Sequence, residues 1–403
     1  MNTKIDLHQT VLALSEALDL VGVDGLQHGK RVAYMMVQGC SGLPPILNET
    51  EMFQLGMLHD IGVSSTETHQ YLVKHLAWEG AEEHCDVGFH RLMRFAPLVK
   101  LAPYVLHHHT RWDEYPSLGV PPDVALIANW VFLTDRVDVM AAGHYAHDIL
   151  EKKEEIIAKV GYLKGRYFAP ELVELFLRLS GNDAFWLDQE PRHLVQFLQN
   201  EVARLPLVDI SYKELKSLAQ IFAEIVDTKS QFTHEHSLGV ARLAKYLAVQ
   251  FKVDSENIER IEIAGLLHDL GKLQTPDEIL DKPGPLDEGE RARLNHHSYE
   301  TFQILHKITG LEDVANWAAL HHESPNGKGY PFQRKGGDLP IEARIIAVAD
   351  VFQALVQNRP YRVGLPDSKV RQIILDFAAT GKLDSEIASW VAERVEICRP
   401  LAQ

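Results

Sequence analysis

Cysteine is scarce in this sequence, with only three among 403 residues. Cys40, Cys85 and Cys398 form no CxxC pair, so we expect no disulfide framework, and a reducing compartment fits. Long apolar runs are also missing, because the best stretch, residues 124–133, is far shorter than the roughly 18 residues of a membrane span. The N-terminal residues lack the basic and apolar segments of a signal peptide. We therefore expect a cytoplasmic protein with no membrane partner.

Positive charge is in short supply as well. The 40 lysines and arginines stand against 56 acidic residues, which gives a formal net charge of −16. Such a chain repels long nucleic acids, so an anionic substrate must be small and must be drawn in by local cations. Apolar residues make up 46% and charged residues 24%, which is the composition of a globular protein, and the length suits two domains. The unusual abundance is 21 histidines, which fall in ordered clusters.

Histidine and aspartate clusters recur in the same order in both halves of the chain. The first half holds them in HGKRV, MLHDIG, HCDVG, LHHHTRWD and LTDRVD, which contain His28, His59, Asp60, His84, His108, His109 and Asp135. The second half holds them in HSLGV, LLHDLGK, HSYET, LHHESPNGKGYP and VADVFQ, which contain His236, His268, Asp269, His297, His321, His322 and Asp350. The offset between matched residues drifts only from 208 (His28 to His236) to 215 (Asp135 to Asp350). We interpret this pattern as a duplicated domain.

The duplication predicts two domains, at residues 1–205 and 206–403. Strand-like alternation is scarce, and apolar residues recur at helical spacing in segments that include residues 210–226, 238–251, 258–267 and 370–377. Asp287 and Glu290 resemble a capping pair before a helix at 291–305. The predicted fold class is all-α, with two helical bundles in tandem.

Seven nitrogen and oxygen donors without a thiolate make the second copy a candidate metal site. A lone histidine on a helix is usually a core or surface residue, but seven donors from five segments, repeated in another copy, favour metal binding. In an adjacent pair such as His268 and Asp269, the imidazole can bind one ion while the carboxylate bridges to another. We assign one ion to His236, His268, Asp269 and Asp350, and the other to Asp269, His297, His321 and His322. This donor set suits two divalent transition metals, with Fe or Mn first and Ni, Co or Zn as alternatives.

A binuclear site of this kind suits phosphodiester hydrolysis. Two ions about 3.5–4 Å apart would lower the pKa of a bridging water and place the resulting hydroxide for in-line attack on phosphorus. Lys272 follows Asp269 by one helical turn, where its ammonium would hold a phosphate oxygen or help the leaving oxygen. The plainer interpretation of Lys272 is a cation that favours a helix C-terminus. We predict that Asp269 and Lys272 are the catalytic residues.

Three segments of the second half resemble the HD-GYP family of HD-superfamily phosphodiesterases, namely HDLGK at 268–272, HHESPNGKGYP at 321–331 and RIIAVADVFQALVQNRPYR at 344–362. The resemblance covers essentially residues 206–403 and implies two tandem HD domains, of which the second hydrolyses a cyclic dinucleotide. Implied substrates are cyclic di-GMP and 3′,3′-cyclic GMP-AMP, and a degenerate upstream HD domain is typical of the subgroup that acts on the latter. The resemblance implies the same seven metal ligands, and substrate contacts from Gly329, Tyr330, Pro331, Arg359 and Arg362, in addition to the predicted contact from Lys272.

Several positions differ from the family pattern. Members with three metals carry Glu four residues before the first ligand histidine, where this sequence has Phe232, so we expect two metals. Ser324 and Asn326 replace the usual Arg and Asp near the GYP loop, and Gln353 replaces the usual Asp after VADxF. These changes remove no predicted ligand, but they leave open which bases of the cyclic dinucleotide the site prefers.

The first copy keeps the equivalent ligands but not the rest of the site. Val63 stands at the lysine position, and Glu114-Tyr115-Pro116 stands loosely in place of the GYP loop. The run His107-His108-His109 leaves the register of its ligands open by one residue. The alternatives for this domain are metal binding without catalysis, a dimerisation or regulatory role, and hydrolysis of another substrate. We favour a regulatory or structural domain, and we leave open its metal binding, a homodimer and protein partners.

The predicted function is metal-dependent hydrolysis of a cyclic dinucleotide to a linear dinucleotide. One alternative is a generic HD-type nucleotide phosphohydrolase, which the GYP and RPYR segments disfavour. Another is a catalytically inactive module that binds a cyclic dinucleotide or a protein, which the complete ligand set disfavours. The sequence does not determine the preferred dinucleotide, whether hydrolysis proceeds to mononucleotides, the native metal or the oligomeric state.

Overall fold

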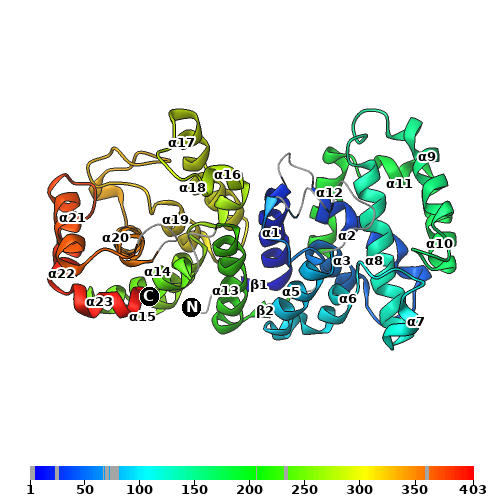
Figure 1. Ribbon diagram of the computed structural model, residues 1–403, viewed down its shortest axis with the longest axis horizontal. Coiled ribbons are helices and arrows are strands. Elements are labelled where there is room, and N and C mark those ends of the chain that lie inside the picture. Colours follow the sequence, from blue (N-terminus) through cyan, green and yellow to red (C-terminus); the bar gives the residue numbers. More distant parts are fainter. Residues whose placement is uncertain are drawn as a thin grey trace. The chain divides into compact units, whose positions relative to one another are not determined.

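The computed structural model describes residues 5–22, 27–66, 68, 72, 81–205, 207–230, 235–358 and 363–403. Helices make up nearly all of the regular structure (Figure 1), and within these ranges the only named strands are β1 (Ile5–Asp6) and β2 (Asp209–Ile210). The two strands pair antiparallel, with Ile5 opposite Ile210. No helix in the described part of the chain has the length and apolar character needed to cross a bilayer. The prediction of an all-α fold is confirmed.

The chain folds as two compact units. The N-terminal unit comprises Leu7–Val208, and the C-terminal unit comprises Asp209–Gln403 together with strand β1. Strand β1 belongs with the C-terminal unit because its partner β2 opens that unit.

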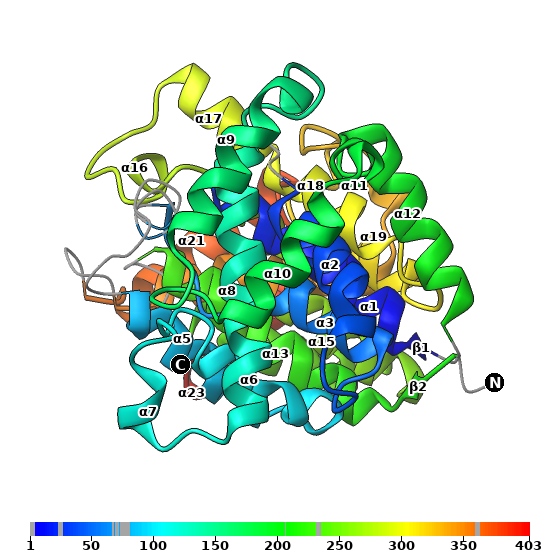
Figure 2. The same cartoon turned by 90° about the vertical axis from the view of Figure 1, so that its right-hand side faces the viewer.

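The N-terminal unit is a helical bundle with one long buried helix, α8 (Pro122–Ala141). The other helices in its described part are α1 (Leu7–Asp19), α2 (His28–Gly39), α3 (Glu49–Leu58), α5 (Ala81–Met93), α6 (Ala102–Leu106), α7 (Tyr115–Leu118), α9 (Ile149–Tyr162), α10 (Pro170–Ser180), α11 (Asp183–Leu187) and α12 (Pro191–Arg204). Short 3-10 segments are η1 (Leu20–Gly22), η2 (Cys40–Gly42) and η3 (Ala96–Leu101). Helix α8 packs against α2, α6, α9 and α10 (Figure 2), which explains why most of its side chains are buried.

The C-terminal unit is a second bundle with α20 (Ile341–Val356) among its most apolar helices. The other helices in its described part are α13 (Tyr212–Lys229), α14 (His236–Gln250), α15 (Ser255–Leu267), α16 (Asp277–Leu280), α17 (Glu288–Asn295), α18 (His297–Leu305), α19 (Glu312–Ala319), α21 (Asp367–Ala379), α22 (Ser385–Glu393) and α23 (Val395–Ala402). Its 3-10 segments are η4 (Leu270–Gln274) and η5 (Gly336–Asp338). Helix α20 packs against α14, α15, α19, α21, α22 and α23.

The duplicated sequence folds into a duplicated core. Helices α2, α3, α5, α6 and α8 correspond in order to α14, α15, α18, α19 and α20. Helix α2 packs on α3 and α8, just as α14 packs on α15 and α20. A glycine permits the close crossing in each copy, since a Cβ on Gly56 would lie 2.4 Å from the Cα of Ala33, and one on Gly265 would lie 2.9 Å from the Cα of Ala241. The same helix crossing therefore holds the same site in both units.

The helices predicted in the second half are confirmed in α13, α14, α15 and α21. The predicted cap is also confirmed, because Asp287 accepts the N–H of Glu290 at 2.8 Å and Glu290 accepts the N–H of Asp287 at 2.9 Å. One prediction is wrong: residues 291–305 do not form one helix, because α17 ends at Asn295 and α18 begins at His297, with His296 between them. The side chain of His297 donates to the Leu294 carbonyl at 2.6 Å, which gives a physical reason for the break.

Candidate metal centre

The adjacent histidine and aspartate of the C-terminal unit lie at the end of a buried helix. Helix α15 ends at Leu267, His268 caps it, and Asp269 precedes η4. The Nδ1 atom of His268 lies 2.8 Å from the Gly265 carbonyl oxygen. Because a carbonyl can only accept, Nδ1 carries a proton and Nε2 is the atom that faces the site. The helix end thus orients the imidazole without the help of a metal ion.

Donors from three separate helices meet around His268. His236, the first residue of α14, places its Nε2 atom 3.3 Å from the Nε2 atom of His268. Asp350 on α20 places its Oδ1 atom 3.4 Å from the Nε2 of His236 and 4.0 Å from that of His268. The Nδ1 of His236 donates to the side-chain oxygen of Gln353 at 2.5 Å, which fixes the ring. These contacts form a first donor group of two imidazoles and one carboxylate.

A second donor group contains His297, His321 and His322, whose ligand atoms lie within 4.8 Å of one another. The Nε2 atoms of His297 and His321 are 3.3 Å apart, and the Nδ1 atom of each donates to a backbone carbonyl at 2.6 Å. The Oδ1 atom of Asp269 lies 3.4 Å from the Nε2 of His297 and 3.8 Å from that of His321. Its Oδ2 atom lies 3.3 Å from the Nε2 of His268. Asp269 therefore lies between the two groups, with one oxygen toward each.

These atoms fit a bound metal ion. Two imidazole nitrogens that bind one ion at about 2.1 Å, at tetrahedral or octahedral angles, lie about 3.0–3.4 Å apart, and both Nε2 pairs are 3.3 Å apart. The Oδ1 atom of Asp269 is buried and accepts no hydrogen bond from the part of the chain that the structure describes. Imidazole and carboxylate donors without thiolate suit first-row transition metals. The histidine and aspartate groups of this unit can therefore hold metal ions.

Burial and neighbouring charges keep most of these ligands in their metal-binding forms. Burial disfavours the imidazolium and lowers the pKa of His297 to about 3 and that of His322 to about 4. Burial opposes ionisation of Asp269, but His268 and Lys272 outweigh it and hold the pKa of that carboxyl well below its ordinary value. His268 differs, because Asp269 outweighs the effect of burial and raises its pKa. At neutral pH the site thus offers an ionised carboxylate and neutral imidazoles at His297 and His322.

Lys272 lies beside the donor groups, within η4. Its Nζ atom is 2.5 Å from the Oδ2 atom of Asp269, and its side chain is 22% exposed. Burial opposes the charged form, but Asp269 outweighs it and raises the pKa of Lys272, so the ammonium is charged at neutral pH. A charged and partly exposed ammonium next to the donors is available to a phosphate group.

The GYP loop lies over the second donor group. The ring of Tyr330 lies 4.8 Å from the ring of His322, measured between centroids. Gly329 is required at its position because a Cβ there would lie 2.4 Å from the Cα of Glu323. Gly329, Tyr330 and Pro331 are therefore held against the backbone that carries the ligand histidines.

The carboxylate of Glu323 holds this loop in place. It is 3% exposed, and its two carboxylate oxygens accept the backbone N–H groups of Phe332 at 2.6 Å and Arg334 at 3.1 Å. Glu323 was not among the residues predicted for the site, although it directly follows the two ligand histidines. Its place next to the ligand histidines is the signal in the sequence that could have marked it as part of the site.

The loop also depends on one of the positions that differ from the family pattern. The side chain of Asn326 donates to the Thr380 carbonyl at 3.0 Å and accepts the N–H of Lys328 at 3.0 Å. Its own backbone N–H donates to the Gly381 carbonyl at 3.0 Å. Ser324 is largely buried at 8% exposure. Asn326 therefore ties the loop to the turn between α21 and α22.

The structure brings all seven predicted ligands of the C-terminal unit together, with Lys272 and the GYP loop beside them. Arg359 and Arg362 lie outside the described residues, and so does Phe232. The phosphate contacts of the two arginines and the exclusion of a third metal therefore stay predictions. Gln353, noted from the sequence only as a departure, is the partner that orients His236.

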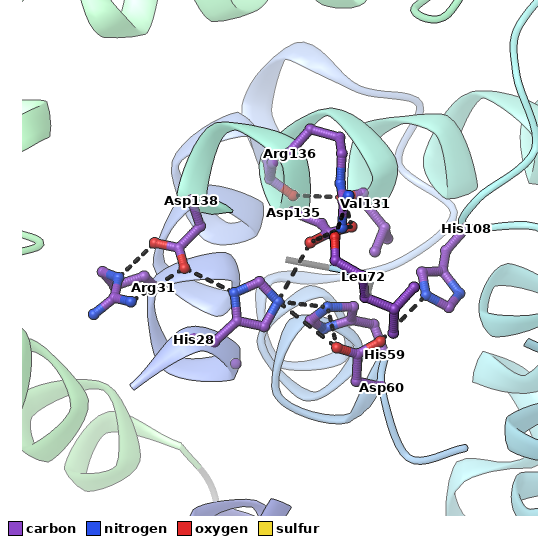
Figure 3. Close-up of polar contacts among 12 residues, drawn as sticks. His28, Arg31, His59, Asp60, Leu72, His108, Val131, Asp135, Arg136 and Asp138 are labelled. Carbon is purple, nitrogen blue, oxygen red and sulfur yellow. Dashed lines mark hydrogen bonds and ion pairs between the residues drawn. The ribbon is translucent and has the colours of Figure 1, made fainter. Parts of the chain in front are cut away.

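The N-terminal unit repeats the donor spacing (Figure 3). The Nε2 atoms of His28 and His59 are 3.2 Å apart. Those of His84 and His108 are also 3.2 Å apart. The Oδ1 atom of Asp60 lies 3.4 Å from the Nε2 of His84 and 3.6 Å from that of His108. The duplication thus extends to the atoms that face the site.

The structure decides the register of the three consecutive histidines. Ligand atoms of Asp60, His84, His108 and His109 lie within 4.8 Å of one another, and His107 belongs to none of the donor groups among the described residues. The predicted equivalents His108 and His109 are therefore the two that face the site.

Two arginines distinguish the N-terminal cluster. Arg136 donates to both carboxylate oxygens of Asp135 at 2.8 to 3.1 Å. Arg31 donates to Asp138 at 2.5 and 3.1 Å, and Asp138 accepts from the Nδ1 of His28 at 2.7 Å (Figure 3). Arginine side chains therefore neutralise the negative charges of Asp135 and Asp138.

Comparisons with known proteins agree with this geometry. A family model described as an HD domain matches residues 220–387. The 3′3′-cGAMP-specific phosphodiesterase 1 of Vibrio cholerae is 34% identical over 390 residues, which cover 95% of this chain and 90% of the relative. The 3′3′-cGAMP-specific phosphodiesterase 3 of the same species is 34% identical over 318 residues, which cover 78% of this chain and 66% of the relative. A crystal structure of a cyclic GMP-AMP-specific phosphodiesterase of V. cholerae, V-cGAP3, matches with a TM-score of 0.64 and 25% identity over 98% of both chains.

A helical bundle in which an adjacent histidine and aspartate meet histidines from other helices defines the HD-domain class. The identity with phosphodiesterase 1, which extends over nearly the whole of both proteins, shows that this chain belongs to the HD-GYP family of HD-domain cyclic dinucleotide phosphodiesterases. The family resemblance drawn from the sequence is confirmed.

Proposed function

We propose that the C-terminal unit hydrolyses a phosphodiester bond of a cyclic dinucleotide, 3′,3′-cyclic GMP-AMP or cyclic di-GMP, to give a linear dinucleotide. The observation that carries this proposal is the similarity to 3′3′-cGAMP-specific phosphodiesterase 1 over 90% of that protein. The donor groups around Asp269 support it, because they suit the chemistry of phosphate ester hydrolysis. The substrate named for phosphodiesterases 1 and 3 makes 3′,3′-cyclic GMP-AMP the first substrate to test.

The proposed site holds two divalent ions, with Fe or Mn first and Ni, Co or Zn as alternatives. One set of ligands is His236, His268, Asp269 and Asp350, and the other is Asp269, His297, His321 and His322. Support comes from the place of Asp269, which has one oxygen toward each donor group. When bound, such ions would lower the pKa of a water molecule and polarise the phosphate.

The remaining residues act on the substrate directly. The Lys272 ammonium holds a nonbridging phosphate oxygen or stabilises the leaving oxygen, since it is charged and partly exposed beside Asp269. The loop of Gly329, Tyr330 and Pro331 borders the bound dinucleotide, because the Tyr330 ring lies over His322. Arg359 and Arg362 contact the phosphates in this proposal, on the strength of the RPYR segment alone.

The test uses the purified full chain with Mn²⁺, or with Fe²⁺ under anaerobic conditions. Each cyclic dinucleotide is incubated separately, and the products are separated by chromatography over time. We expect a linear dinucleotide, and the later time points show whether mononucleotides follow. Binding of the intact cyclic dinucleotide without turnover under either metal would show an inactive binding module instead. Turnover of mononucleotides but of neither cyclic dinucleotide would show a generic HD phosphohydrolase.

A further inference from the structure

The N-terminal unit holds a cluster of histidines and an aspartate that the proposed hydrolysis does not use. Asp60 follows α3, His84 lies in α5, and His108 and His109 follow α6. Their ligand atoms lie within 4.8 Å of one another, which makes this the largest donor group among the described residues. We propose that these four side chains bind one divalent transition-metal ion of their own, in a site that does not hydrolyse the dinucleotide.

Unpartnered atoms mark the place of the ion. The Nε2 atom of His109 and the Oδ1 atom of Asp60 are buried, and neither makes a hydrogen bond to any described residue. The side chain of His109 is only 5% exposed, and its nearest carboxylate oxygen, on Asp135, is 3.6 Å away. Buried polar atoms are nearly always satisfied in folded proteins, so two such atoms facing one cluster indicate a ligand between them.

The geometry and chemistry of the donors define the class of ligand. The Nε2 atoms of His84 and His108 are 3.2 Å apart, close to the 3.3 Å of the matching pair in the C-terminal unit. The Nδ1 of His108 donates to the Val105 carbonyl at 2.6 Å, so the Nε2 atom is the one that faces the cluster. Three imidazoles and one carboxylate form a four-donor set that suits Zn²⁺, Co²⁺ or Fe²⁺.

A salt bridge limits this unit to one ion. Arg136 donates to both oxygens of Asp135, whereas the C-terminal unit has the uncharged Val351 at the corresponding position. Asp135, which corresponds to Asp350, therefore forms a salt bridge with Arg136. On that side, His28 and His59 have Asp60 as a third donor, while Asp135, whose Oδ1 atom lies 3.3 Å from the Nε2 of His28, is paired with Arg136.

The surroundings of the ion do not suit phosphate chemistry. Val63 stands where the C-terminal unit has Lys272, so no ammonium lies next to Asp60 at that position. The segment that corresponds to the GYP loop forms the short helix α7, and the Tyr115 hydroxyl donates to the His107 carbonyl at 2.9 Å. The ion therefore joins the ends of α3 and α6 to α5 and stabilises the unit.

The metal content of the full chain tests this inference without any activity assay. The protein is stripped with a chelator, reloaded with Co²⁺ or Zn²⁺ alone, desalted and analysed by mass spectrometry of the metal. We expect His109→Gln to lower the content by about one ion per chain. The matched control is His107→Gln, which changes the neighbouring histidine outside the cluster and leaves the content at the wild-type value. Circular dichroism confirms that both variants are folded.

A second variant decides the question even if His109→Gln does not fold. Changing His268, Asp269 and His321 to alanine breaks both donor groups of the C-terminal unit and leaves the N-terminal cluster intact. We expect this variant to keep about one ion per chain, and to melt at a lower temperature after chelation. Retention of no ion would overturn the inference, and so would equal metal content in folded His109→Gln and wild-type protein. Loss of about two ions in His109→Gln would overturn the assignment of a single ion.

Discussion

The two units share the spacing of their donor atoms and differ in what surrounds them. Facing Nε2 atoms are 3.2 Å apart in the N-terminal unit and 3.3 Å apart in the C-terminal unit. Lys272 and a loop held by Glu323 flank the C-terminal donors, whereas Val63 and the salt bridge of Arg136 flank the N-terminal ones. Helix ends therefore set the donor geometry in both units, while the proposed catalysis depends on the cation and the loop that are added around the C-terminal donors.

Loss of the adjacent histidine and aspartate should distinguish the two units most strongly. Changing His268 and Asp269 to alanine removes a ligand and the carboxylate between the donor groups, so we expect turnover to fall by more than about 1,000-fold. The same change at His59 and Asp60 should lower turnover by less than about tenfold, because the phosphate chemistry lies in the other unit. Steady-state assays on folded variants measure both. An equal loss from the two changes would show that the N-terminal cluster takes part in hydrolysis.

Removal of the ammonium should have the next largest effect. Lys272→Ala takes away the charge proposed to contact the phosphate, and we expect kcat to fall by about 100-fold. Lys272→Arg should keep part of the rate, since it retains the charge with a different shape. A rate for Lys272→Ala equal to that of the wild type would remove Lys272 from the mechanism. The reciprocal Val63→Lys should add no hydrolysis in the protein that lacks the C-terminal HD pair.

The loop should contribute less than the ammonium. Glu323→Gln weakens the acceptor for the N–H groups of Phe332 and Arg334, so the GYP loop loosens. We expect kcat/KM to fall by about tenfold, mainly through KM, because the loop is proposed to bind substrate rather than to react. Glu288→Gln, at an exposed carboxylate of α17, is the control. A fall in kcat with KM unchanged would contradict a role confined to binding.

The smallest effect concerns the residue that orients His236. Gln353→Asp would place a carboxylate against its Nδ1, as Asp138 does for His28 in the other unit. A carboxylate partner raises the basicity of a ligand imidazole, so we expect the C-terminal unit to retain metal a few-fold more tightly. Competition with a chelator of known affinity measures this. Weaker retention would show that the longer side chain of Gln353 is needed for the position of the ring.

Much of the fold was accessible from the sequence. The helical periodicity of residues 210–226 and 370–377 is a local property, and it correctly predicts α13 and α21. The break at His296 was not predicted, because it accompanies a hydrogen bond of the His297 ring that periodicity does not encode. The pairing of β1 with β2 was missed for a similar reason, since two-residue strands carry no pattern.

The sequence by itself determined the all-helical class, the duplication and the family, and, for the site, the order of the donors along the chain. These follow from local spacing and from two copies that can be read side by side. Only the tertiary structure decided which of three consecutive histidines face the N-terminal cluster and that Glu323 holds the GYP loop. It also decided the partners of the ligands, such as Gln353, which lies 117 residues from His236 in the chain. Such contacts depend on where side-chain atoms from distant helices meet, and one sequence does not specify that place.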